Sequence, residues 1–419
     1  MMNSRLQMVL TVTLVVIGVS LVAVDLGAQH KVAFATSVQG NGNLGDPGQW
    51  PDNGGLSGLD AADKVCQNRA LAAGLANHTD FIAWMSDSSD DAYCRVHDLS
   101  GLKSADCGLA TLPVWAGPWV RTNGSHFAAT IDLALDPTGQ IFNPVLFDEF
   151  GVEVGAYTAI FTGTESDGVY APGLDGCGGW SNGVSGHVVL GHVRGTTVRW
   201  TGGATGACAD SRSLLCLEAG GAGPDLPPAV ANGAQVFVTS VAGTADLGGW
   251  PEAGGASGID AGDAICRTLA GNAGLFAPLS YMAMLSNNSV DARDRFTTDG
   301  PWVRLDGVLV SRMNELFNDS VIESSIGFTE TGSYISDWVF TGTSYLGDGV
   351  PENCGEWSNG STGDAMAGSS AMTQSGWTVG LRSCAGPARL YCFSDTDTWH
   401  IFSDGFESGD TDGWDGTSP

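Results

Sequence analysis

The sequence predicts two copies of one α+β domain arranged in tandem, and three observations support this prediction. Residues 50–66 (WPDNGGLSGLDAADKVC) return at 250–266 (WPEAGGASGIDAGDAIC), with ten of the seventeen positions identical. A repeat over so long a period indicates duplicated domains, because solenoid repeats are only tens of residues long. The 419 residues also exceed what one hydrophobic core usually organises. The 61 glycines indicate many turns and short strands around the repeated segment.

The repeated segment carries the signals of an amphipathic helix. Ser57 is expected to be its N-cap, with Asp60 three residues later as in a capping box. Apolar residues follow at spacings of three and four, on one helix face, at positions 59, 62, 66, 70 and 73. Gly74 is expected to end the helix. The second copy repeats the pattern from Ser257 and Asp260.

Short strands are expected on either side of this helix in both copies. Alternating or apolar runs lie at 31–38, 81–86 and 213–218 in the first copy and at 235–241, 280–286 and 389–394 in the second. Between them the copies share GPWVR (117–121 and 300–304), a phenylalanine-containing strand (160–164 and 339–343) and a CGxWSNG motif (177–183 and 354–360). The order of elements is therefore predicted to be the same in both domains.

The first copy contains an insertion that the second copy lacks. Trp84 and Trp119 are separated by 35 residues, whereas the equivalent Met284 and Trp302 are separated by 18. Cys94 and Cys107 are the two cysteines without counterparts in the second copy. They are therefore predicted to form a disulfide with each other.

Three further segments complete the predicted organisation. Residues 1–28 read as a signal peptide, with Arg5 before an apolar run; an uncleaved membrane anchor is the alternative. Residues 29–217 and 235–394 are the two domains, joined by the Pro- and Gly-rich linker 218–234. The acidic tail 395–419 is expected to be a flexible end, and its DGFESGD stretch resembles a short terminal segment of secreted bacterial proteins.

Charge and cysteine content limit the partners and the location. The net charge of -29 disfavours binding to nucleic acid, heparin-like polyanions and anionic lipids. The ten cysteines contain no Cys-x-x-Cys pair or zinc-type cluster, so disulfides are expected. The sequence thus predicts a secreted, extracellular or periplasmic protein of the cell envelope, with no stable membrane insertion after the signal peptide is cleaved.

The cysteine layout and the strand motifs resemble a known family. The run GLDAADKVCQNRALAAGL followed by FIAWMS, and then IFTGT, CGGWSNG and SLLCLE, resemble endostatin-like domains of the C-type-lectin-like superfamily. Related domains occur in bacterial secreted proteins of unknown function. The resemblance implies mixed, twisted, mainly antiparallel sheets with flanking helices. It also implies four disulfides, Cys66–Cys216, Cys177–Cys208, Cys266–Cys392 and Cys354–Cys384; spacing alone leaves three connectivities for each set of four.

The same resemblance suggests where a ligand binds. Lectins of this superfamily that bind sugar through calcium have a Trp-Asn-Asp strand, and this chain has Trp180 and Asn182 in one copy and Trp357 and Asn359 in the other. The following acid is absent, so no cofactor or metal is predicted; calcium stays an alternative that the motif does not support. These four residues are the candidate ligand-binding set. The structural alternative is a core tryptophan and a turn-forming asparagine.

Two other groups of residues have both a functional and a structural interpretation. Asp60 and Asp63 recur as Asp260 and Asp263; they could hold a cation, but a role at the helix start or an ion pair with Arg121 or Arg304 is favoured. His187 and His192 lie five apart on an expected strand. They should face opposite sides, which disfavours a shared metal.

No catalytic motif accompanies these features. The chain lacks a G-x-S-x-G elbow, H-E-x-x-H, a P-loop and a dinucleotide fingerprint, so it is predicted not to be an enzyme. The first hypothesis is a secreted binding protein that recognises a glycan or protein ligand on a cell or matrix surface, since duplication can raise avidity. The alternative is a structural envelope or surface protein with no small-molecule ligand.

Overall fold

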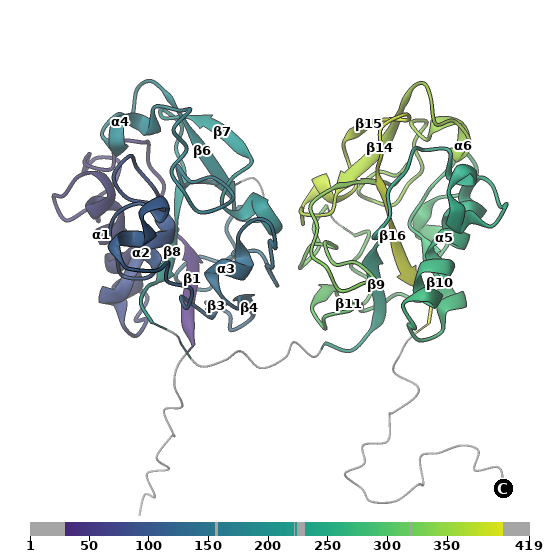
Figure 1. Ribbon diagram of the computed structural model, residues 1–419, viewed down its shortest axis with the longest axis horizontal. Helices are drawn as coiled ribbons and strands as arrows, with labels where there is room; N and C mark the ends of the chain where they lie inside the picture. The colour runs from purple at the N-terminus through teal and green to yellow at the C-terminus, as the bar shows by residue number, and fades with distance from the viewer. Residues whose placement is uncertain (1–29, 156–157, 222, 224–230, 319, 397–419) are drawn as a thin grey trace, which may run out of the picture.

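A computed structural model describes residues 30–155, 158–221, 223, 231–318 and 320–396 (Figure 1). The predicted signal peptide and the tail beyond residue 396 lie outside these residues. The described chain forms two α+β domains, each built on an eight-stranded mixed sheet. The predicted fold class and duplication are confirmed at this level.

The two sheets have the same strand order. The first is β4-β3-β1-β8-β5-β6-β7, with β2 also paired to β8, and the second is β12-β11-β9-β16-β13-β14-β15, with β10 paired to β16. The first-domain strands are β1 Lys31–Ala35, β2 Phe81–Ala83, β3 Trp119–Arg121, β4 His126–Ala128, β5 Ala159–Phe161, β6 His187–His192, β7 Ala204–Ala207 and β8 Ser213–Glu218. The second-domain strands are β9 Ala234–Val238, β10 Tyr281–Ala283, β11 Trp302–Arg304, β12 Leu309–Ser311, β13 Trp338–Phe340, β14 Asp364–Ser369, β15 Leu381–Ser383 and β16 Arg389–Ser394. The pairs β1–β3 and β5–β8, with their second-domain counterparts, are parallel and the others antiparallel.

The α-helices are few and mostly short. They are α1 Gly58–Ala72, α2 Ala92–Val96, α3 Ile131–Ala134, α4 Gly176–Trp180, α5 Gly258–Asn272 and α6 Cys354–Trp357. The repeated helix is thus present in both copies, as α1 and α5. Its N-cap residue, Ser57, has extended backbone angles but makes no side-chain capping hydrogen bond, so the predicted capping box is wrong. Gly74 adopts φ 72°, as expected for the residue that ends a helix.

Each sheet is covered on both faces, which gives each domain two apolar clusters. On one face of the first sheet Ala62, Cys66 and Ala70 of α1 pack against sheet residues that include Phe34 and Phe161. The other face is covered by α2, α3 and the inserted segment. The helix face predicted from the spacing is therefore buried at Ala62, Cys66 and Ala70, whereas Leu59 and Ala73 at its two ends are half-buried.

All five predicted disulfides are present. The long bridges tie α1 to β8 through Cys66–Cys216 and α5 to β16 through Cys266–Cys392. The short bridges are Cys177–Cys208 and Cys354–Cys384, and Cys94–Cys107 closes the insertion. Disulfides are typical of oxidising compartments, so this set fits a location outside the cytoplasm.

The connection between the domains is shorter than predicted. Glu218 still belongs to β8 and Ala234 already belongs to β9, because both pair within their sheets. The connecting segment is therefore 219–233 rather than 218–234. Within the described part of the chain, no helix is long and apolar enough to cross a membrane.

The two domains contact each other through equivalent segments that follow β6 and β14. Gly195 forms an antiparallel bridge with Met372, and each lies five residues before the buried tryptophan of its domain, Trp200 or Trp377. The Thr196 N–H donates to Ala371 O (2.9 Å). Reciprocally, the hydroxyl of Thr373, the counterpart of Thr196, donates to Arg194 O (3.1 Å). The interface thus joins the same surface of both copies, with local two-fold symmetry.

Candidate functional site

The two tryptophans of the predicted ligand-binding set are buried in the cores. Trp180 and Trp357 are both 0% exposed. Their indole N–H groups donate to the carbonyls of Ser86 (2.9 Å) and Ser286 (2.8 Å). No face of either ring is accessible to a ligand, so the structural alternative describes these tryptophans.

The two asparagines of the set lie at the surface and stabilise turns. The Asn182 side-chain oxygen accepts hydrogen bonds from the N–H groups of Val184 (2.9 Å) and Ser185 (3.2 Å). Asn359 makes the same pattern with Ser361 (3.0 Å) and Thr362 (3.3 Å). These contacts use the acceptor atoms locally. Ligand binding by Asn182 and Asn359 stays a prediction.

The aspartates on the repeated helices have structural partners that differ from the expected ones. Asp63 accepts from Ala83 N–H (2.9 Å) and pairs with Arg95. Asp263 likewise accepts from Ala283 N–H (3.0 Å) and pairs with Arg295 at 2.7 Å. The expected pairing with Arg121 or Arg304 is wrong, because α2 and its counterpart bring a nearer arginine.

The remaining paired candidates do not converge on a site. Asp60 and Asp260 are exposed in the first turns of α1 and α5. His187 is exposed at the start of β6, whereas His192 is half-buried at its end. Among the residues that the structure describes, no group of three or more His, Cys, Asp or Glu side chains could hold a metal ion.

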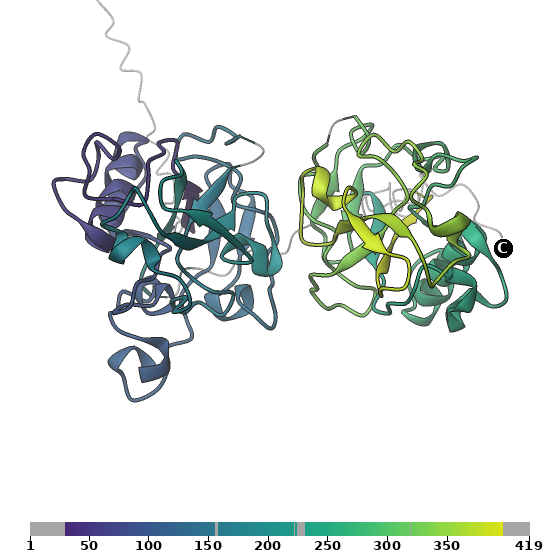
Figure 2. The same ribbon diagram turned by 90° about the horizontal axis from the view of Figure 1, so that it is seen from above.

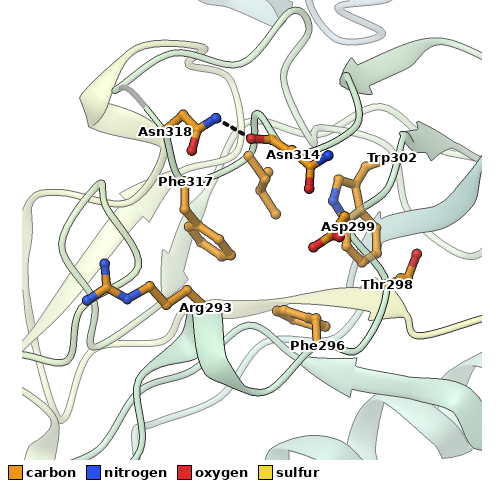
Figure 3. A pocket seen from close by; sticks show the side chains of 9 residues that line it. Arg293, Phe296, Thr298, Asp299, Trp302, Asn314, Phe317 and Asn318 are labelled. Carbon is orange, nitrogen blue, oxygen red and sulfur yellow. Dashed lines mark hydrogen bonds between the residues drawn. The ribbon is translucent and has the colours of Figure 1, made fainter.

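A pocket that the sequence did not reveal lies in the second domain, beside β11 (Figure 3). Its volume is about 260 Å³, below the roughly 300–1,000 Å³ typical of sites for drug-sized ligands. It therefore accommodates one ring-sized group rather than an extended molecule. Its lining residues are Arg293, Phe296, Thr298, Asp299, Trp302, Asn314, Leu316, Phe317 and Asn318.

Aromatic rings form the apolar part of the pocket. Trp302 is only 2% exposed and packs edge-on against Phe296, with ring centroids 5.5 Å apart, and against Phe393 of the last strand at 4.8 Å. Phe296 and Phe317 are half-buried. Figure 3 shows the rings of Phe296, Phe317 and Trp302 arranged around one space. The pocket thus has a rigid floor and two partly accessible ring walls.

Polar side chains surround this aromatic floor. Asp299, Asn314 and Asn318 are exposed at the rim. The Asn318 amide donates to the Asn314 backbone carbonyl, which orders that edge (Figure 3). Arg293 pairs with Asp348, and Figure 3 shows its guanidinium directed away from Phe296 and Trp302. Donors and acceptors at the rim and rings below are a combination suited to an amphipathic ring.

The equivalent region of the first domain is filled by the chain itself. Arg95 and Arg295 make the same contacts, so the residues two positions earlier, Tyr93 and Arg293, are counterparts. Tyr93 is fully buried and donates to the Pro113 carbonyl and to Asp132. The inserted segment packs here through apolar side chains and the Cys94–Cys107 bridge, and it projects from the first domain in Figure 2. The pocket is open only where the insertion is missing.

The chain matches no model of a known protein family, and no curated protein is significantly similar to it. Evidence for a role of the pocket therefore comes from its geometry alone. A signal for it existed in the sequence, since the 17-residue difference between the copies lies where the pocket is open in one domain and filled in the other.

Proposed function

We propose that this protein is a secreted, non-catalytic binding protein whose second domain recognises a terminal sugar of a glycan on a cell or matrix surface. The observation that carries the proposal is the pocket of about 260 Å³ with an aromatic floor and an amide- and carboxylate-bearing rim. A sugar ring has an apolar C–H face and polar edges. The half-buried ring of Phe317 can contact the first, and Asn314, Asn318 and Asp299 can hydrogen-bond the second.

A lectin-like fold for the two domains agrees with this proposal. The support is the resemblance of the strand and cysteine motifs to endostatin-like domains, together with mixed sheets closed by a helix-to-last-strand disulfide. Sugar binding would then be independent of calcium and use a different surface from the WSNG motif, whose tryptophans are buried.

The test is capture of the full secreted chain on a glycan array, with variants of the pocket. Phe317→Ala removes an accessible ring wall, and Asn314→Gly removes a rim amide at a position whose φ of 62° glycine tolerates. Loss of one such contact is expected to weaken sugar binding by about 1–2 kcal/mol, or roughly 5–30-fold. The control is Leu381→Ala, an exposed apolar residue on the opposite sheet edge.

Two results would contradict the proposal. In the first, the chain unfolds cooperatively, and is therefore folded, but captures no glycan of the array above background. In the second, Phe317→Ala and Leu381→Ala change glycan capture equally. A fluorescence or calorimetric unfolding curve for each variant separates lost binding from lost folding.

The alternative, a structural envelope protein, is favoured by one observation. The backbone contacts between the domains, such as Gly195–Met372 and Thr196–Ala371, suit a stiff two-domain spacer. Pull-down from intact cell envelopes distinguishes the two functions. If the protein is a spacer, the envelopes retain Phe317→Ala and the unmodified chain equally. If it binds sugar, they retain Phe317→Ala less than the unmodified chain.

A further inference from the structure

The last described residues of the chain lie at the rim of the pocket. The Asp395 carboxylate accepts hydrogen bonds from the N–H groups of Thr297 (2.6 Å) and Thr298 (3.0 Å), and from the Thr297 hydroxyl (2.7 Å). Thr298 itself lines the pocket. The C-terminal segment 397–419 therefore starts two residues beyond an anchor on the pocket wall.

The first domain indicates the direction in which the chain leaves its last strand. Ala219 follows β8 and donates its N–H to the Asp80 carbonyl (2.9 Å), as Asp395 after β16 does to the Ser280 carbonyl (3.0 Å). One residue later, the Gly220 N–H donates to the Val96 carbonyl (3.0 Å). Val96 is the counterpart of Phe296, since each follows the equivalent arginine. In the first domain the exit path therefore passes Val96, the residue equivalent to Phe296 of the pocket.

The segment that starts there contains suitable ring-sized groups. Residues 397–419 include Trp399, Phe402, Phe406 and Trp414. Trp399 is the third residue after Thr396, and three extended residues span at most about 10 Å. The first domain also provides a precedent within the molecule, because its own chain fills the equivalent space with the Tyr93 ring.

We propose that the C-terminal segment places the indole of Trp399 in the second-domain pocket and competes there with the external ligand. This proposal rests on the binding function proposed above. The ring of Trp399 takes the place of the sugar ring over Phe317, and the anchor at Asp395 keeps its effective concentration high because only a short length of chain separates the two. A segment that fills the pocket nine-tenths of the time weakens apparent sugar affinity about tenfold.

The segment can be followed by ¹⁹F NMR of the full chain labelled with 5-fluorotryptophan. The Trp399 resonance is identified by its loss in Trp399→Phe. It is expected to be shifted from the position of free tryptophan in the unmodified chain, and to return to that position in Phe317→Ala and in Asn314→Gly. Leu381→Ala is the matched control and should leave it shifted.

A second measurement compares capture of the array's glycans by the full chain, by Trp399→Ala and by a chain that stops after Thr396. Both changes are expected to raise apparent affinity about tenfold. A Trp399 resonance at the free position in the unmodified chain overturns the inference, as does unchanged affinity after truncation. The proposed function survives that outcome if Phe317→Ala still loses binding. Conversely, a Trp399 resonance that responds to Phe317→Ala without any captured glycan supports the inference and refutes sugar recognition.

Discussion

His192 lies at the interface between the domains, and we expect it to make the folded protein less stable in mild acid. Burial at the end of β6, together with the smaller effect of the nearby charges of Arg199 and Arg212, lowers the pKa of this imidazole from 6.5 to about 4. Its Nδ1 accepts the Arg194 N–H (3.2 Å), and its Nε2 faces the second domain. The amide of Gln374, from the second domain, lies 3.4 Å from that atom.

The sign and size of the effect follow from the two pKa values. The unfolded chain binds a proton at His192 near pH 6.5, whereas the folded chain does not until about pH 4. Folding stability therefore falls as the pH drops from 6.5 towards 4, and this residue has no effect above pH 7. The loss in the free energy of unfolding is about 2 kcal/mol at pH 5 and about 3 kcal/mol below pH 4.

The assay is denaturant unfolding at pH 7 and pH 5 of the unmodified chain, His192→Gln and a control, His187→Gln, at the exposed start of the same strand. Between the two pH values the unmodified chain and the control should each lose about 2 kcal/mol more than His192→Gln. The carboxylates that titrate in this range are common to all three chains and cancel in the comparison. An equal loss in all three would refute the assignment of the acid sensitivity to His192.

Three further outcomes are expected. Arg304 is fully buried and pairs with Asp306 at 2.6 Å. Arg304→Met should therefore lower the free energy of unfolding of the second domain by about 3–5 kcal/mol, measured with denaturant. A loss under about 1 kcal/mol would contradict the role of Arg304 as the partner of a buried charge. Gly342 has φ 60° and an added Cβ would lie 2.5 Å from the Trp357 indole, so Gly342→Ala should cost about 2 kcal/mol or more, measured as a lower denaturation midpoint. Treatment with EDTA should leave the melting temperature unchanged, because the described residues hold no group of three metal-ligating side chains; a drop of several degrees would show that a cation stabilises the fold.

The duplicated fold was predictable because its signals are local. The helix of the repeated segment follows from apolar spacing over a few turns, and β8 and β16 match their predicted bounds. The Cys94–Cys107 pair followed from counting residues between shared motifs. Each of these features depends on residues close in sequence, or on a direct comparison of the two copies.

The difference in length between the copies marks the region of the pocket, but its lining residues were not predictable because they depend on packing between distant segments. Phe296 and Phe317 are 21 residues apart and converge only because β11 and the loop after β12 bring them together. Conversely, the sequence left both a ligand-binding and a core role open for Trp180. Its ring is buried against Gly163, where an added Cβ would lie 2.7 Å from the indole, a contact that the local sequence does not reveal.

The local two-fold symmetry at Gly195 and Met372 has a consequence for how the two halves can diverge. A dimer of identical chains joined through this surface would carry every insertion twice, once in each subunit. Fusion of the copies into one chain removes that constraint while keeping the same contact. One copy can then lose its pocket to an insertion, as around Tyr93, without closing the other. Under the proposed function, the first domain is a fixed platform for the single binding pocket of the second domain.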